Sequence, residues 1–222
     1  MALEVKNLTF SYGSLRVLHG LEFSVEPGEV VGLLGQNGAG KTTLIKVLAC
    51  LLARDTGYVA MDGIDPEALP VRYRSNLGYL SEACPLYGEM SVRSYLAYRA
   101  LLKGERGSRV RVRVREAIAS CGLEDAADAR INSLSKGMRK RVGLADATLR
   151  RPKLLLLDDP LASLDAASRL RVGEVVAAAA TRAVVVVSGH EPQEMSHWCT
   201  RFITLKDRRI VSDVPNSPLK LN

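Results

Sequence analysis

The sequence predicts an α/β fold built around a mainly parallel sheet, and three apolar runs carry this prediction. The runs lie at 29–35, 153–157 and 183–188, and segments with helical spacing separate them. Apolar runs of this length without alternation are typical of strands that are buried on both faces of a parallel sheet. Each run ends in a polar or glycine-rich loop. Because ligands bind at the carboxyl ends of such strands, we expect the functional site there.

The first 30 residues have a different pattern, which indicates short antiparallel strands. Apolar and polar residues alternate more freely here, and Gly13, Gly20, Pro27 and Gly28 mark turns. We therefore expect an N-terminal antiparallel β subdomain. From about residue 84 to residue 150, apolar residues recur at three- and four-residue spacing, as in "SVRSYLAYRALL" and "REAIASCGL", which indicates helices.

Together these patterns predict a single domain over 1–222. We expect its core at about 1–82 and 151–212, with a helical insertion subdomain at about 83–150. A chain of 222 residues, 47% of them hydrophobic, is long and apolar enough to bury such a core.

Residues 109–116, "RVRVRVRE", allow two interpretations. The alternation fits a basic-faced strand or a stripe that binds nucleic acid, whereas Val110, Val114 and Ile118 also fall on one face of a helix. The segment continues into good helix formers and has no interleaved aromatic residue that could stack on a base. We favour a helix with a solvated basic face and expect no nucleic-acid partner.

Charge, cysteine spacing and hydropathy limit the class of protein. The formal charge of +7 suits anionic partners, whether nucleotide phosphates, nucleic acid or an anionic lipid surface. No C-x-x-C pair occurs, which argues against a zinc site or a disulfide framework and fits a reducing compartment; the four cysteines are Cys50, Cys84, Cys121 and Cys199. The chain has neither a long uncharged apolar segment nor a secretory leader pattern. We expect a protein that neither spans a membrane nor is exported.

A phosphate-binding loop follows the first apolar run. The motif "GQNGAGKTT" fits G-x-x-x-x-G-K-T and leads into a helical pattern; its residues are Gly35, Gln36, Asn37, Gly38, Ala39, Gly40, Lys41, Thr42 and Thr43. The glycines let successive N–H groups point inward, and the helix N-terminus adds partial positive charge. Lys41 can then reach the β- and γ-phosphates, and the Thr42 hydroxyl can ligand Mg²⁺.

Two adjacent carboxylates, Asp158 and Asp159, follow the second apolar run. Taken alone, such a pair fits a turn or a helix cap as well as a site. A phosphate loop, however, needs a second acid that orients Mg²⁺ at the end of a neighbouring strand, and Asp158 supplies it. This reasoning leaves Asp159 without a role.

The stretch "SLSKGMRKRVGLADATL" from Ser133 resembles the signature motif of ATP-binding cassette (ABC) proteins. With the phosphate loop and the leucine run, the resemblance covers nearly the whole chain. Tyr12 is similar to the aromatic residue that stacks on adenine, "SLD" at Ser163 to Asp165 to the D-loop, and His190 to the switch histidine.

The resemblance implies a P-loop NTPase core that binds ATP and Mg²⁺. It implies a head-to-tail dimer with a second nucleotide-binding subunit, in which Ser135 and Gly137 act in trans, and catalytic roles for Lys41, Asp159 and His190. The spacing of the signature stretch is more similar to bacterial exporters than to importers. The resemblance thus implies an ATP-hydrolysing exporter subunit, cytoplasmic and bound to the membrane through separate membrane-spanning subunits.

Two residues depart from the family pattern. Glu82 stands where the family has the Q-loop glutamine that touches Mg²⁺, and a carboxylate there can still ligand the metal. Asp159 stands where the family has its catalytic glutamate, which predicts slow hydrolysis. This departure keeps open a slow or non-hydrolysing clamp, or the degenerate half of a heterodimer. A soluble ABC protein of DNA repair or translation is disfavoured, because those have tandem nucleotide domains or long coiled coils.

Overall fold

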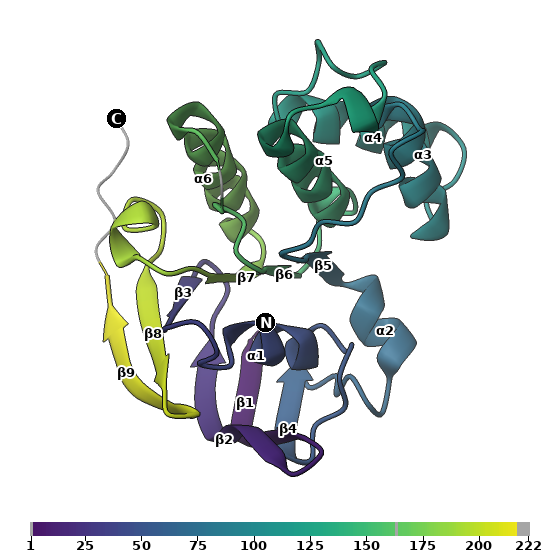
Figure 1. Cartoon of the computed structure of the whole chain (residues 1–222). Coiled ribbons are helices and arrows are strands. Elements are labelled where there is room, and N and C mark those ends of the chain that lie inside the picture. The colour runs from purple at the N-terminus through teal and green to yellow at the C-terminus, as the bar shows by residue number, and fades with distance from the viewer. Residues whose placement is uncertain (1, 163, 217–222) are drawn as a thin grey trace.

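A six-stranded sheet crosses the middle of the molecule, and helices cover both of its faces (Figure 1). The computed structural model describes residues 2–162 and 164–216. The strand order is β5-β6-β7-β3-β8-β9. The strands are β5 (Leu77–Leu80), β6 (Leu154–Leu157), β7 (Val184–Ser188), β3 (Val30–Leu34), β8 (Arg201–Lys206) and β9 (Arg209–Pro215). All neighbours pair in parallel except β8 and β9, so the predicted, mainly parallel sheet is confirmed.

The apolar runs are continuous because both faces of the sheet are buried. Along β6, Leu155 and Leu157 join the core on the side of α5 and α6, whereas Leu154 and Leu156 join the core on the side of α1. Alternate side chains of a strand point to opposite faces, so a strand between two cores needs apolar residues at every position. Here α1 spans Lys41–Leu48, α5 Lys136–Thr148 and α6 Ala166–Ala180.

The predicted N-terminal antiparallel sheet is also present, with the strand order β2-β1-β4. Its strands are β1 (Leu3–Tyr12), β2 (Leu15–Val25) and β4 (Thr56–Met61). Helix α1 lies between this sheet and the six-stranded sheet (Figure 1), and its Leu44 and Leu48 are fully buried there. The short helix α2 (Pro70–Ser75) follows, with the Tyr73 hydroxyl donating to the Leu48 carbonyl at 2.8 Å.

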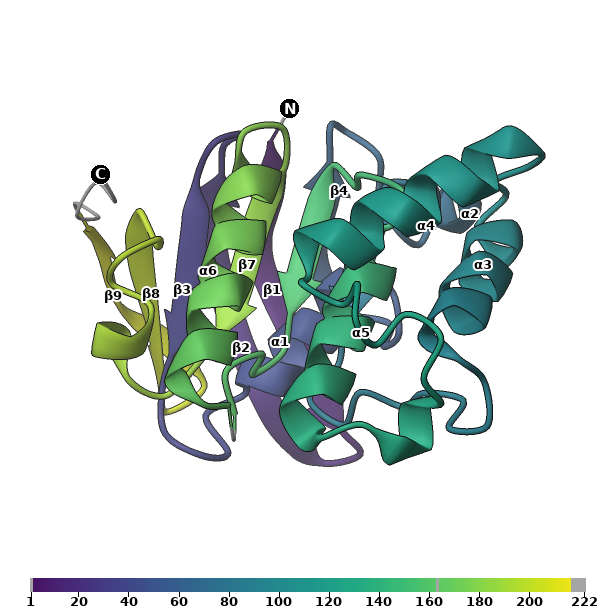
Figure 2. The ribbon, with the colours of Figure 1, turned by 90° about the horizontal axis from the view of Figure 1, so that it is seen from above.

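The segment between β5 and β6 is helical, as its spacing predicts. It holds α3 (Val92–Leu102), α4 (Ser108–Ser120), the 3₁₀ turn Ile131–Ser133 and α5, and α3 packs against α4 (Figure 2). The "RVRVRVRE" stretch lies in α4, with Val114, Ala117 and Ile118 buried. The helical interpretation is therefore confirmed. No helix in 2–162 or 164–216 is long and apolar enough to cross a membrane.

Candidate functional site

Most of the predicted site residues converge at the carboxyl ends of β3, β5, β6 and β7. There a cavity of about 370 Å³ is lined by Val17, Asn37, Gly38, Ala39, Gly40, Lys41, Thr42, Thr43, Glu82, Asp158, Asp159, Ser188 and His190. The phosphate loop, both aspartates, Glu82 and the histidine, which are far apart in sequence, thus share one space. This is the edge of the sheet where ligands bind in such folds.

The backbone of the loop needs glycine at two close approaches. Gly35 has φ 150°, and a Cβ there would lie 2.5 Å from the Leu205 carbonyl oxygen. Gly40, the residue before α1, has φ 103°, and a Cβ would lie 2.9 Å from the Leu18 side chain. The first turn of α1 contains no acidic residue. Its N–H groups and its partial positive charge therefore suit a phosphate.

Lys41 is the cation of this cavity. Its side chain is buried, and its Nζ donates to the carbonyl oxygens of Gly35 at 2.5 Å and of Gln36 at 3.1 Å. Burial lowers the pKa of Lys41, and the carboxylates of Asp159 and Asp158 oppose that shift. The ammonium thus lies at the loop backbone, where phosphate oxygens would be in its reach.

Asp158 has the properties of a Mg²⁺ ligand. It is 1% exposed, and its Oδ1 accepts from the Thr42 hydroxyl at 3.1 Å. Its Oδ2 is buried and has no hydrogen-bond partner in the described residues, an unsatisfied acceptor that a cation would pair with. With Asp159 and Glu82 the cavity holds three carboxylates against one lysine. Oxygen donors and an excess of negative charge fit Mg²⁺, which takes only one or two carboxylates and fills its shell with phosphate and water.

Asp159 lies beside His190, and its backbone is in the left-handed region. The Oδ2 of Asp159 is 3.6 Å from Nε2 of His190, and its φ is 46°. Glu82 lines the same cavity, and Lys140 of α5 donates to its carbonyl oxygen at 2.9 Å. Both departures from the family pattern are therefore at the site, together with His190.

Sequence reasoning missed Ser188, the last residue of β7. Its hydroxyl donates to Oδ1 of Asp158 at 2.8 Å and accepts from the N–H of Asp159 at 2.9 Å. A polar residue at the end of an apolar strand was the available signal, since the same rule singled out Asp158.

Gly35 and Gln36, at the start of the phosphate loop, do not line the cavity, and three further predicted binding residues lie away from it. Tyr12 is 47% exposed at the end of β1 and contacts Phe10 edge to face, with ring centroids 4.8 Å apart. Ser135 caps α5, accepting from the N–H of Met138 at 3.2 Å, and Gly137 lies in the first turn of that helix. None of the three lines the cavity that holds Lys41.

The predicted D-loop is described only in part. Ser163 lies outside the described residues. Asp165 caps α6 by accepting from the N–H of Ser168 at 2.7 Å, and this hydrogen bond lowers the pKa of Asp165.

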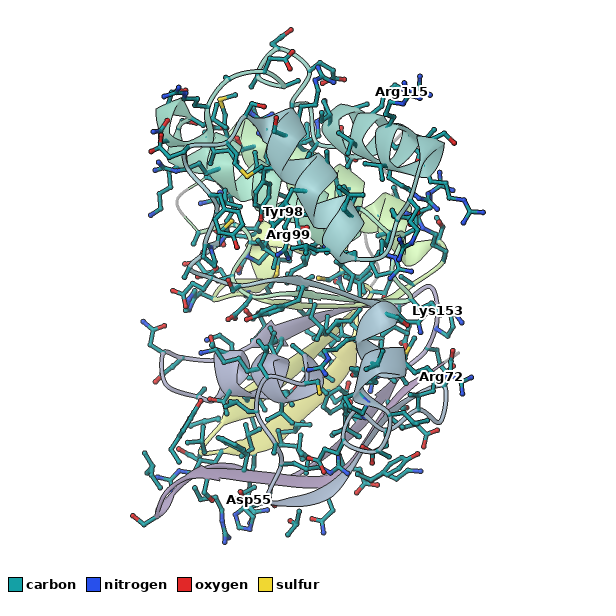
Figure 3. The ribbon with its side chains drawn as sticks, turned by 90° about the vertical axis from the view of Figure 1, so that its right-hand side faces the viewer. Asp55, Arg72, Tyr98, Arg99, Arg115 and Lys153 are labelled. Carbon is teal, nitrogen blue, oxygen red and sulfur yellow. The ribbon has the colours of Figure 1, made fainter. Side chains whose placement is uncertain are left out.

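A second cavity, of about 300 Å³, lies where α3 and α5 meet the end of β5. Its lining includes Tyr79, Cys84, Leu86, Tyr87, Tyr95, Arg99 and Asp146. Figure 3 shows Tyr98 and Arg99 on this side of the molecule, just above the sheet. Tyr87 is 53% exposed, with its ring centroid 5.9 Å from those of both Tyr95 and Tyr98. We name this cavity, with Tyr98 at its rim, the tyrosine groove.

Comparison with known proteins places this architecture in a family. The family model described as "ABC transporter" matches residues 18–162. The chain is 38% identical over 173 residues to the sulfate/thiosulfate import ATP-binding protein CysA of Methylococcus capsulatus. This match covers 76% of the present chain and 49% of that protein. The chain thus spans about half the length of this relative.

Two further matches extend over almost the whole chain. The Nod factor export ATP-binding protein I of Paraburkholderia xenovorans is 32% identical over 221 residues, covering 97% of this chain and 72% of that protein. A solved structure titled as the ATP-binding subunit of an ABC transporter superposes with a TM-score of 0.88 at 28% identity, covering 97% of this chain and 90% of that one. From the matching family model, these relatives and the phosphate loop facing Asp158, we conclude that the chain belongs to the ABC transporter family of ATP-binding subunits.

Proposed function

We propose that this chain binds ATP with Mg²⁺ in the cavity around Lys41 and hydrolyses it, as the ATPase subunit of a membrane exporter. The observation that carries the proposal is the meeting of the phosphate loop with Asp158 and Asp159 in one cavity. The relatives include an importer and an exporter component, so export rests on the spacing of the signature stretch.

Each group has a distinct task. The loop N–H groups and Lys41 bind the phosphates, while Thr42, Asp158 and Glu82 hold Mg²⁺. When bound, the metal ion neutralises charge on the β- and γ-phosphates. Asp159 orients the water whose oxygen bonds to the γ-phosphorus and accepts its proton, as the bond from phosphorus to the ADP oxygen breaks. His190, whose Nε2 lies 3.6 Å from Oδ2 of Asp159, positions that carboxylate relative to the γ-phosphate.

Two properties of the site imply a second nucleotide-binding subunit. Ser135 and Gly137 lie at the start of α5, outside the cavity that holds Lys41. The oxygen of the Ser135 hydroxyl accepts from the N–H of Met138 and so caps the helix, and the O–H of the same group can donate to a phosphate of a partner's nucleotide. A head-to-tail dimer would place these groups over the other subunit's ATP, with Tyr12 of each subunit against the adenine. Either a like or an unlike partner satisfies this geometry.

The tyrosine groove is the proposed docking surface for the membrane-spanning subunits. It combines exposed aromatic surface with Arg99, and such apolar patches often bind partners. We take 83–150 as a helical subdomain that connects this groove to Glu82 in the ATP site. The subunit would then be cytoplasmic and held at the membrane by its partners.

Phosphate release tests the hydrolysis proposal. We expect slow, Mg²⁺-dependent release of phosphate from ATP, with almost none from Lys41→Ala or Asp158→Asn. The alternative is a clamp that binds ATP without turning it over. Tight ATP binding with no release above the Lys41→Ala background would favour the clamp.

A further inference from the structure

The Ser188 hydroxyl joins two strand ends at the site. It is 1% exposed at the end of β7, and its partners, Asp158 and Asp159, follow β6. An ionised carboxylate can only accept and a backbone N–H can only donate. The hydroxyl must therefore give its proton to Oδ1 of Asp158 and take the N–H of Asp159 on its oxygen. Both hydrogen-bonding capacities are used, one for each acid.

The first hydrogen bond decides which oxygen of Asp158 stays available. Ser188 and Thr42 both donate to Oδ1, at 2.8 Å and 3.1 Å. Oδ2 has no hydrogen-bond partner among the described residues. A carboxylate held through one oxygen presents the other in a fixed direction, and partners behind a metal ligand orient it in this way.

The second hydrogen bond fixes the backbone that carries Asp159. A residue with φ 46° is in the left-handed region, which is unfavourable for residues with a side chain, although Asp tolerates it better than most. Without the Ser188 hydroxyl the half-buried N–H of Asp159 would lose this hydrogen-bond partner, which is unfavourable for the present backbone conformation. The hydrogen bond therefore favours the conformation that brings the Asp159 carboxylate to His190.

We propose that Ser188 is a positioning residue for this site. It orients the Asp158 carboxylate to bind Mg²⁺ and holds Asp159 in place to act on the attacking water. The inference rests on the proposed ATPase function and extends it to a side chain whose hydroxyl is bonded to both acids. It predicts that removing this hydroxyl weakens Mg²⁺ binding and lowers kcat together, because the one hydroxyl is bonded to both acids.

The test compares Ser188→Ala with Ser188→Thr, which keeps the hydroxyl. We expect Ser188→Ala to lower kcat about 10- to 100-fold and to weaken Mg²⁺ binding in the presence of ATP about tenfold, the range for losing a partner of a metal ligand. KM for ATP should change less than about threefold, because the loop and Lys41 bind the phosphates. Ser188→Thr should stay within about threefold of wild type in both quantities.

The matched control is Thr148→Ala, which deletes a hydroxyl that donates to the Leu144 carbonyl at 2.9 Å, at the far end of α5. It should match Ser188→Ala in the loss of thermal stability but leave kcat and Mg²⁺ binding unchanged. Wild-type kcat and Mg²⁺ binding in Ser188→Ala would overturn the proposal, and so would a loss that Ser188→Thr fails to reverse. If wild type itself releases no phosphate, the ATPase proposal fails, and the Mg²⁺ titration still decides the role of Ser188.

Discussion

Nε2 of His190 lies 3.6 Å from Oδ2 of Asp159, and this pair sits nearer the solvent than Asp158. The side chains of His190 and Asp159 are 45% and 20% exposed, whereas Asp158 is 1% exposed. The two neighbouring acids therefore occupy different environments. The buried one suits a metal, and the one at the cavity mouth suits a water molecule that has to enter.

The first prediction concerns the length of the Asp159 side chain. Asp159→Glu should speed phosphate release, because the aspartate carboxylate is withdrawn by one C–C bond, and misplacement by about 1 Å can cost about a hundredfold. Asp159→Asn should nearly abolish release, because an amide cannot accept the proton of the water. ATP affinity should change little, since Lys41, Thr42 and Asp158 remain. Steady-state phosphate release and nucleotide titration measure both effects.

The backbone at this position adds a stability effect to the same experiment. Asp tolerates the left-handed region better than Glu does, so Asp159→Glu should lower the free energy of unfolding by up to about 1 kcal/mol while raising turnover. Equal turnover in wild type, Asp159→Glu and Asp159→Asn would show that Asp159 takes no part in the mechanism. It would favour the alternative that this chain is the nucleotide-binding half of a heterodimer.

Sequence patterns predicted the sheet because burial on both faces leaves a direct trace. In β6 and β7 every residue is buried, so the runs are uninterrupted. The α4 segment was harder, because strict alternation also fits a strand. Its three buried side chains, Val114, Ala117 and Ile118, decide for the helix.

The hydrogen bonds that position the site residues could not be predicted from any pattern in the sequence. Ser188 and Asp158 are 30 residues apart, and Lys140 and Glu82 are 58 apart. No periodicity relates such pairs, and a serine or lysine at these positions is ordinary without its partner in view. The left-handed backbone of Asp159 could not be predicted from the sequence either, because Asp occurs in many backbone conformations. The carboxylates could be predicted, whereas the groups that orient them could not.

The second prediction is that ATP with Mg²⁺ drives dimerisation when hydrolysis is blocked. Each nucleotide would bridge Lys41 of one subunit and Ser135 of the other, so its binding energy is linked to association. In Asp159→Asn, light scattering should show the mass doubling at saturating nucleotide. Lys41→Ala in the same background should stay monomeric. A chain that remains monomeric with bound nucleotide would speak against a homodimer and point to an unlike partner.

The third prediction concerns an ion pair away from the site. Arg54 donates to both carboxylate oxygens of Asp65, at 3.2 Å and 2.7 Å. Burial raises the pKa of Asp65, but hydrogen bonds from Arg54 and from the N–H of Glu67 outweigh it, and the net pKa lies below the usual 3.8. A carboxyl with a lowered folded-state pKa adds stability above its unfolded-state pKa, and this is lost as pH falls through the folded-state value.

Asp65→Asn should therefore reduce the free energy of unfolding by about 1–2 kcal/mol at neutral pH. The difference from wild type should begin to shrink below about pH 4, where the unfolded state starts to bind the proton, and should keep shrinking until the pH has passed the lower folded-state pKa. Denaturant unfolding at several pH values measures it, and phosphate release at neutral pH should be unchanged. A difference that stays constant down to pH 3 would mean that the charge of Asp65 is not what stabilises this loop.

The last prediction is that the tyrosine groove binds a protein in the membrane rather than the lipid. Tyr87 is 53% exposed between Tyr95 and Tyr98, and a large aromatic side chain in such a position often contributes strongly to an interface. The chain should sediment with native membranes but not with protein-free liposomes made from the same lipids. Tyr87→Ala should weaken the membrane binding about tenfold, roughly the loss of 1.4 kcal/mol, and leave ATP binding intact. Val211→Ala is the matched control, because Val211 is 55% exposed on β9, away from α3 (Figure 1). Equal binding to liposomes and native membranes would mean that the net positive charge of the chain, rather than this groove, attaches it to the membrane.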